Sequence, residues 1–343
     1  MNASMSMSMK KKTGTAVVLS LAILLLGIVL GSVTVPALDV FGIMAHTLFD
    51  RSLPEHITDA QYAIVWNLRF PRVLLAFVAG AALSVSGAVM QSVLRNPLAS
   101  SYTLGVSSGA SFGAALVIFL GFSAFSVFTL PILGFLFGLG TIFAVMAIAS
   151  RMDGQMANHT IILTGMVFSL FINAITTLLF ALFRENVQRM VLWQMGSFSM
   201  RDWHTVAILA PITLAGIIFI MRYKWELDVM TFGEEQANAI GVNSKNAKWV
   251  LLILAAALTG STIAFVGVIG FVDLVAPHIV RRIFGSSHLV VIPMSALVGG
   301  MFMVLCDLAA RTVVAPIELP VGAVTALIGA PFFAYIYFGK GKV

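Results

Sequence analysis

Residues 66–92 read WNLRFPRVLLAFVAGAALSVSGAVMQS, a run in which no charged residue follows Arg72. A helix needs about 20 mostly apolar residues to cross the hydrocarbon core of a bilayer. Arg69 and Arg72 stand at the start of the run with Pro71 between them, and proline is tolerated in the first turn of a helix. The stretch therefore predicts a transmembrane helix that begins at the two arginines.

Further apolar runs occupy most of the chain on both sides of this one. They lie at about 14–35, 100–121, 125–150, 158–183, 203–221, 247–268, 271–284, 289–309 and 322–338. The run at 271–284 is short and contains Pro277, so one span fewer or one more is also possible. We expect an all-α, polytopic integral membrane protein with about ten transmembrane helices.

The composition of the chain agrees with this fold class. Of the 343 residues, 59% are hydrophobic and only 10% are charged, whereas soluble proteins carry about 25% charged residues. The 29 glycines suit helices that approach one another closely within lipid. The single cysteine, Cys306, excludes an internal disulfide framework and a cysteine-rich metal site. We expect neither a metal nor a cofactor on this chain.

The positions of the charged residues predict the topology. The formal net charge is +6, but the lysines and arginines lie mainly beside apolar runs, so we expect no nucleic-acid partner. Most of them fall on one side if both termini are cytoplasmic, which is the orientation that the positive-inside rule favours. We expect a multi-pass protein of the cell membrane with a cytoplasmic tail over 1–13, disordered in its Met-Ser repeat, and a single transmembrane domain over 14–339. The longest polar stretches, about 36–65 outside and 222–246 inside, are too short for a second core.

Charged residues at the outer ends of two predicted spans form the first candidate site. Arg69 and Arg72 are three apart, so a helix places them on one face. Their side chains are expected either to snorkel to the interface or to dock an acidic group, because guanidinium forks bind carboxylates in a bidentate way. Asp307 and Arg311 are four apart and are expected to pair on one helix face.

The cytoplasmic segment at about 223–246 contains a predicted short helix. Glu234 and Glu235 suit the positive end of a helix dipole, and Gly241 suits a C-terminal cap. This helix is either a solvated loop helix or a rigid platform for a cytoplasmic partner. Asn96 and Pro97 form a turn signal in another cytoplasmic segment.

Five segments in a fixed order resemble the FecCD-type permeases, the membrane subunits of ATP-binding-cassette (ABC) importers for iron-siderophores, haem and cobalamin. The segments are RFPR at 69–72, RNPLA at 95–99, FGEEQANAIG at 232–241, GFVDL with PHIVR between 270 and 281, and DLAAR with ELPVG between 307 and 322. The resemblance extends from about Trp66 to Tyr335.

This resemblance implies partners and residue roles. Two ATPase subunits would bind on the cytoplasmic side, a substrate-binding protein outside, and a second permease subunit, identical or related, within the membrane lipid. The residues implied in docking the binding protein are Arg69, Arg72 and Arg311. Those implied in ATPase coupling are Gly233, Glu234, Glu235, Ala237 and Gly241. Candidates for the path or its gate are Asn96, Pro97, Asp273, Pro277 and His278.

The chain departs from the family pattern at two positions. Ser101 stands where the family often has proline, and Asp273 stands where it commonly has glycine. Asp273 is expected either to cap the short helix that follows it or to face the path and bias the charge of the substrate.

The expected function is therefore inward transport of an iron(III)-siderophore or similar chelate by alternating access. The sequence has no Gly-x-x-x-x-Gly-Lys-Ser/Thr phosphate loop, so ATP hydrolysis is expected in the partner subunits and not in this chain. A haem or cobalamin permease is an alternative within the class. An ion-coupled secondary transporter is an alternative outside it, although such proteins place ionisable residues in mid-span.

Overall fold

The computed structural model describes residues 3–122, 124–125 and 128–338, and these residues form helices without any strand. The first half contains α1 (Ala3–Val29), α2 (Ala37–Phe49), α3 (Asp59–Tyr62), η1 (Ala63–Arg69), α4 (Phe70–Val93), α5 (Val106–Leu120), α6 (Thr129–Met152) and α7 (Asn158–Leu182). The second half contains η3 (Arg184–Asn186), α8 (Val187–Gln194), α9 (Trp203–Arg222), α10 (Lys224–Met230), α11 (Glu234–Ala239), α12 (Ser244–Val266), α13 (Val272–Phe284), α14 (His288–Thr312) and α15 (Val321–Phe338).

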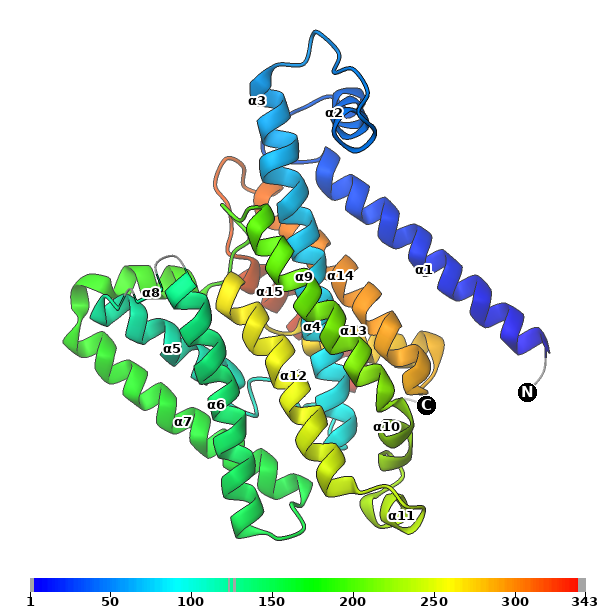
Figure 1. The fold of residues 1–343 in the computed structure, drawn as a ribbon, viewed down its shortest axis with the longest axis vertical. Helices are drawn as coiled ribbons and strands as arrows, with labels where there is room; N and C mark the ends of the chain where they lie inside the picture. Colours follow the sequence, from blue (N-terminus) through cyan, green and yellow to red (C-terminus); the bar gives the residue numbers. More distant parts are fainter. Residues whose placement is uncertain (1–2, 123, 126–127, 339–343) are drawn as a thin grey trace.

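Helix α4 is the central element of the bundle (Figure 1). It packs against α14, α12, α13 and α9, and nearly all of its residues from Pro71 onward are buried. With α3 and the π-helical turn η1 it makes one continuous rod, Asp59–Val93. Burial on all sides explains why this stretch is apolar without an amphipathic period.

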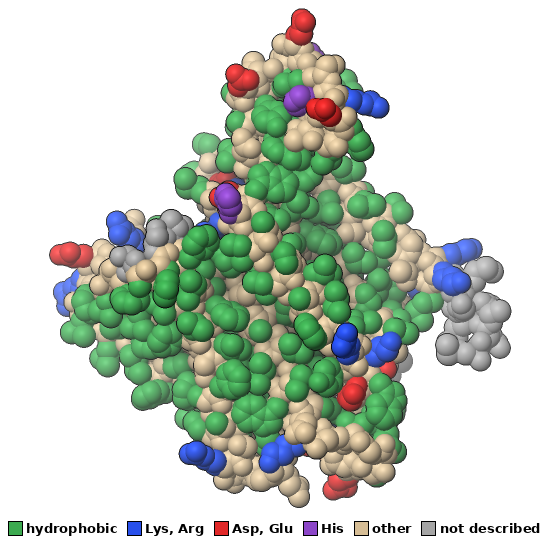
Figure 2. Space-filling model, viewed as in Figure 1, with side chains coloured by type: hydrophobic (Ala, Val, Ile, Leu, Met, Phe, Trp, Pro, Cys, Tyr) green, Lys and Arg blue, Asp and Glu red, His purple; other side chains and the backbone are tan. Residues whose placement is uncertain are grey.

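Seven helices in the described residues are long and apolar enough to cross a membrane. Every predicted run forms a helix, but α5, α13 and α15 are shorter or less apolar than the others. Hydrophobic side chains cover the middle of the face drawn in Figure 2, while charged side chains gather near its edges and at its ends. The chain is therefore a multi-pass membrane protein, as its sequence predicted.

The structure differs from the sequence predictions in two segments near the N-terminus. Residues 3–13 are helical and continuous with α1 and not disordered, while their cytoplasmic location stays a prediction; residues 1–2 lie outside the described part. The stretch 36–65, expected to be polar, contains the apolar helix α2, and the central rod begins at Asp59 and not near residue 66. Helix α2 escaped notice because, with 13 residues, it is too short to span a bilayer.

The short helices α5 and α13 both begin inside the bundle and run to opposite ends of it. Gly105, directly before α5, lies beside Thr141 and Ser169 in the middle of α6 and α7. Helix α5 then runs antiparallel to α6 and ends with Phe119 near Met190 of α8. Helix α13 begins beside α4 and ends next to the start of α14, close to α10. We call the end with α10 and α11 the α11 end, and the opposite one the α2 end (Figure 1).

The contact between α4 and α14 makes a prediction about stability. A Cβ on Gly80 would overlap the carbonyl oxygen of Gly299, whereas a Cβ on Gly140 of α6 would meet nothing within 4 Å. Gly80→Val should therefore lower the free energy of unfolding by about 1–3 kcal/mol, the usual cost of overpacking. Thermal unfolding of the purified protein should show a lower midpoint for Gly80→Val, with Gly140→Val close to the original. Equal midpoints for the two variants would contradict this close helix contact.

Candidate functional site at the junction of two short helices

The segments that lead into α5 and α13 meet at the centre of the bundle. The backbone N–H and the hydroxyl of Ser101 donate to Oδ2 of Asp273 at 3.4 and 3.2 Å. Gly87 of α4 lies directly under the carbonyl group of Asp273, where any side chain would overlap it. Gln91 Nε2 donates to the same carbonyl oxygen at 2.9 Å. The two residues at which the chain departs from the family pattern therefore bind each other.

A cavity of about 480 Å³ lies at this junction. Its walls include Tyr102 before α5, Phe271 and Asp273 at the start of α13, and Gly322 and Ala326 of α15. Asp273 is only 3% exposed, and its Oδ1 atom has no hydrogen-bond partner within the described residues. The junction thus combines a cavity with a buried carboxylate that is only partly satisfied.

The capping role expected for Asp273 was wrong. The N-cap of α13 is Phe271, which has a left-handed backbone with φ of 68° and makes no capping hydrogen bond through its side chain. Asp273 lies in the first turn, where a negative charge suits the helix dipole. Its second expected role, facing a path, is compatible with its place in the cavity wall and stays a prediction.

A chain of polar contacts connects this junction with the α11 end. Arg281 of α13 donates from Nη1 to Gln91 Oε1 at 2.5 Å and from Nη2 to Ser92 Oγ at 3.0 Å. Ser92 Oγ lies 2.6 Å from Nε2 of the buried His288. Nδ1 of His288 lies 2.6 Å from Oδ1 of Asp228 in α10, and its backbone N–H donates to the same oxygen at 2.8 Å. Helices α13, α4, α14 and α10 are thereby joined.

The predicted short helix at the α11 end is confirmed as α11, Glu234–Ala239. Lys248 of α12 is fully buried, and its Nζ donates to Glu234 Oε1 and to the carbonyl oxygen of Met156, both at 2.6 Å. Phe232 and Ile240, on either side of α11, are 76% and 58% exposed. Helix α11 is thus fixed to the bundle on one side and carries apolar side chains on its exposed flanks.

The three arginines near the α2 end are buried. Arg72 Nη2 lies 2.9 Å from Oδ1 of Asp307, and its Nη1 donates to Glu318 Oε1 at 2.7 Å. Arg311 pairs with Asp307 at 3.4 Å, as their spacing predicted, and donates to the carbonyl oxygen of Gly27. Arg69 donates to the carbonyl oxygens of α1 and the segment after it. The interpretation of Arg69 and Arg72 as snorkelling side chains was wrong, because they are only 5% and 8% exposed.

Glu318 lies in the segment between α14 and α15. Burial raises its pKa, but the hydrogen bond from Arg72 and the charge of that residue lower it, so that the pKa lies below its usual value. Glu318 is therefore ionised at neutral pH and remains a partner of Arg72. The docking role expected for Arg69, Arg72 and Arg311 stays a prediction, and it has to account for the bonds they already make within the chain.

The remaining path candidates lie outside the wall of the junction cavity. Asn96 accepts from the backbone N–H of Leu98 at 2.9 Å, and neither Asn96 nor Pro97 lines the junction cavity. Pro277 and His278 lie on α13, where the ring of His278 is 6.3 Å from that of Phe333 in α15. Of the five candidates, only Asp273 lies in the cavity wall.

Sequence reasoning missed the residues that join the junction to the α11 end. His288 and Asp228 are 60 positions apart, and Lys248 reaches a carbonyl group 92 positions away, so no local spacing pairs them. Arg281 was noted only as part of the PHIVR segment and as a charge beside an apolar run, without a partner. Gln91 and Ser92 at the end of an apolar run were the available signal, since polar side chains at membrane depth need partners.

The sequence profile of the FecCD transport family matches residues 18–338. The chain belongs to this family, and with it to the ABC importer permeases. It is 44% identical to the uncharacterized ABC transporter permease protein YvrB of Bacillus subtilis, over 91% of this chain and 89% of that protein. A solved structure described as an inward-facing conformation of a putative metal-chelate type ABC transporter matches with a TM-score of 0.77 and 31% identity, over 88% of this chain and 98% of the other.

The named cargo differs among the relatives of this FecCD permease. The hemin transport system permease protein HmuU of Yersinia pestis is 36% identical, over 92% of this chain and 93% of that protein. The molybdate import system permease protein MolB of Haemophilus influenzae is 33% identical, over 92% and 91%. Membership in the family therefore does not fix the cargo.

The ion pairs of Arg72 predict a structural role for this residue, which can be tested by thermal unfolding. Removing one partner of a buried ion pair costs up to about 3–5 kcal/mol when the other charge is left without compensation. Without Arg72, Asp307 keeps only Arg311 at 3.4 Å, and Glu318 loses the partner of its ion pair. Arg72→Gln should therefore lower the midpoint of thermal unfolding strongly, while Arg184→Gln, at an exposed position, should not. If Arg72→Gln has the same unfolding midpoint as the original protein, the ion pairs of Arg72 do not stabilise the α2 end.

Proposed function

We propose that this chain is one of two permease subunits of an ABC importer that moves a metal chelate, such as an iron(III)-siderophore, into the cytoplasm. The observation that carries the proposal is the chain of polar contacts between Asp228 on α10 and Asp273 at the junction cavity. It joins an exposed end of the bundle to the place where its two short helices meet. Such a connection suits a transporter whose driving force is applied at one end.

The α11 end would bind the ATPase subunits. Phe232 and Ile240 offer an apolar contact, and clusters of exposed apolar side chains are typical of interaction surfaces. A displacement of α11 would reach α12 through Glu234 and Lys248, and a displacement of α10 would reach α4 and α13 through His288. In this orientation both termini are cytoplasmic, and no step of ATP hydrolysis occurs on this chain.

The junction cavity would form part of the path. It is walled by α15 and by the starts of the two short helices. A second subunit, identical or related, would complete the path, and the substrate-binding protein would dock at the α2 end. Alternating access would then consist of a change in how α5 and α13 meet.

An intact chelate as cargo is supported by the relative HmuU, which is named as a hemin transport permease, and by the similarity to a solved structure described as of metal-chelate type. A chelate keeps its metal coordinated, so it needs a path of suitable width and polarity and no ligands from the permease. Tyr102 and Phe271 give the cavity aromatic surface, and Asp273 gives it a carboxyl group.

Replacing His288 tests the coupling route. His288→Leu should leave the complex assembled and the ATPase active, but should lower substrate uptake per ATP hydrolysed by roughly tenfold, since single residues in such networks change coupling by about 0.5–2 kcal/mol. Uptake and ATP hydrolysis are measured together in vesicles that contain the complete importer. The matched control is His159→Leu, at an exposed position of α7.

An unchanged ratio of uptake to hydrolysis in His288→Leu would contradict the coupling route. Uptake that continues without ATPase subunits and stops when the proton gradient is removed would favour an ion-coupled secondary transporter.

The cargo is tested on the binding protein that purifies with this permease. An iron(III)-siderophore should quench the intrinsic fluorescence of that protein at micromolar concentration, whereas haem, cobalamin and molybdate should not. Quenching by one of the other three compounds, with none by iron chelates, would correct the cargo and leave the importer class intact.

A further inference from the structure

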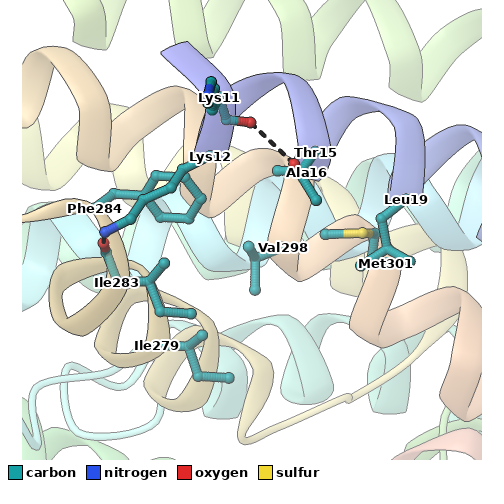
Figure 3. A pocket seen from close by; sticks show the side chains of 10 residues that line it. All are labelled: Lys11, Lys12, Thr15, Ala16, Leu19, Ile279, Ile283, Phe284, Val298 and Met301. Carbon is teal, nitrogen blue, oxygen red and sulfur yellow. Dashed lines mark hydrogen bonds between the residues drawn. The ribbon is translucent and has the colours of Figure 1, made fainter. Parts of the chain in front are cut away.

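A groove runs between α1 on one side and α13 and α14 on the other, apart from the junction cavity. Its volume is about 730 Å³, within the range of about 300–1,000 Å³ that is usual for ligand pockets. Lys11 and Lys12 lie at one end of the groove, and Leu19 and Met301 lie at the other (Figure 3).

The basic end of the groove marks the membrane surface. Lys12 Nζ donates to the carbonyl oxygen of Ile283 at 3.0 Å, in the last turn of α13, where a cation also suits the helix dipole. The apolar part of α1 begins directly after these lysines. Because the lysines precede a membrane-spanning stretch, they lie at the level of the lipid headgroups.

The rest of the groove is lined by hydrocarbon. Ala16 and Leu19 of α1 face Ile279 of α13 and Val298 and Met301 of α14 across it. These side chains follow α1 away from its basic end, so the apolar wall continues from the headgroup level into the hydrocarbon layer.

Helix α1 is held to the bundle mainly at its α2 end, where Arg69 and Arg311 bind its last carbonyl groups. Only 22% of its apolar window is buried, the same share as in α7 and α9, so most of α1 faces away from the bundle. Val18 and Leu21 are 67% and 57% exposed, as expected of side chains that face hydrocarbon. A molecule in the groove would therefore add contacts near the basic end of α1, away from the bonds that hold its other end.

We propose that an anionic phospholipid occupies this groove, with its phosphate at Lys11 and Lys12 and an acyl chain along Ala16, Leu19, Val298 and Met301. The charge of the site and the apolar character of its walls match the two parts of such a lipid in the order in which a bilayer presents them. No carboxylate lines the groove in the part of the chain that the structure describes. Basic pockets between membrane helices at this level are suited to anionic headgroups.

The lipid fits better than a second copy of the chain. A two-fold interface brings the same surface patch of both copies together. The lysines of one copy would then face those of the other, without an acidic partner in the groove. The bound lipid would fasten α1 to α13, the helix that carries Asp273 at its opposite end.

The proposal is tested by titrating the delipidated full chain with phosphatidylglycerol or phosphatidylcholine in mild detergent. Bound lipid is counted by native mass spectrometry, and the midpoint of thermal unfolding is measured separately. Phosphatidylglycerol should bind and raise the unfolding midpoint, and phosphatidylcholine should have little effect. Each lysine near a membrane surface contributes about 1 kcal/mol, so K11Q/K12Q should weaken phosphatidylglycerol binding by roughly 30-fold. Lys10→Gln is the matched control, since Lys10 is exposed but does not line the groove.

A second variant, Val298→Trp, fills the apolar part and leaves both lysines in place. Val298→Trp should abolish lipid binding. This test does not depend on whether the lysine variants fold like the original protein. Equal binding of the two lipids, or equal binding by K11Q/K12Q and Lys10→Gln, would overturn the proposal. The proposal would also be overturned if both variants changed the monomer–dimer equilibrium of the chain and left lipid binding unchanged. None of these outcomes depends on the cargo or on ATPase coupling.

Discussion

The fold depends on one constraint: a backbone N–H or carbonyl group at membrane depth has no water to bind and must find a partner inside the protein. Continuous helices meet this requirement by themselves. The segments 94–105 and 267–271 do not, because each interrupts the chain before a short helix. They are tolerated only because the bundle closes around them and supplies the missing partners.

Two side chains of the central helix bind carbonyl groups in the first turn of α13, directly after the second interruption. Ser84 Oγ donates to the carbonyl oxygen of Val272 at 3.3 Å, and Gln91 Nε2 donates to that of Asp273 at 2.9 Å. Gly87 lies between them and allows the start of α13 to touch α4. The same requirement that stabilises the interruption thus creates the polar junction at which the cavity lies.

Buried charges extend this arrangement to both ends of the bundle. At the α2 end, Asp307 lies between Arg72 and Arg311, which tie α4 and α1 to α14. At the α11 end, Lys248 and His288 connect the helices of the segment at 223–246 with the bundle. Because an unpaired buried charge is costly, these contacts restrict how the helices can shift, and a transport cycle has to exchange or preserve them.

The sequence by itself determined that the chain is helical, that its long apolar runs form helices in a membrane, and that the chain resembles the FecCD permeases. Apolar length and charge content fix these properties locally. It also determined that Asp307 and Arg311 pair, since their spacing of four is a property of any helix. It did not determine that α5 and α13 start inside the bundle or that Ser101 binds Asp273. It also did not reveal that the arginines are buried. Those features join residues that are distant in the chain, and only the tertiary structure decides which distant polar groups become partners.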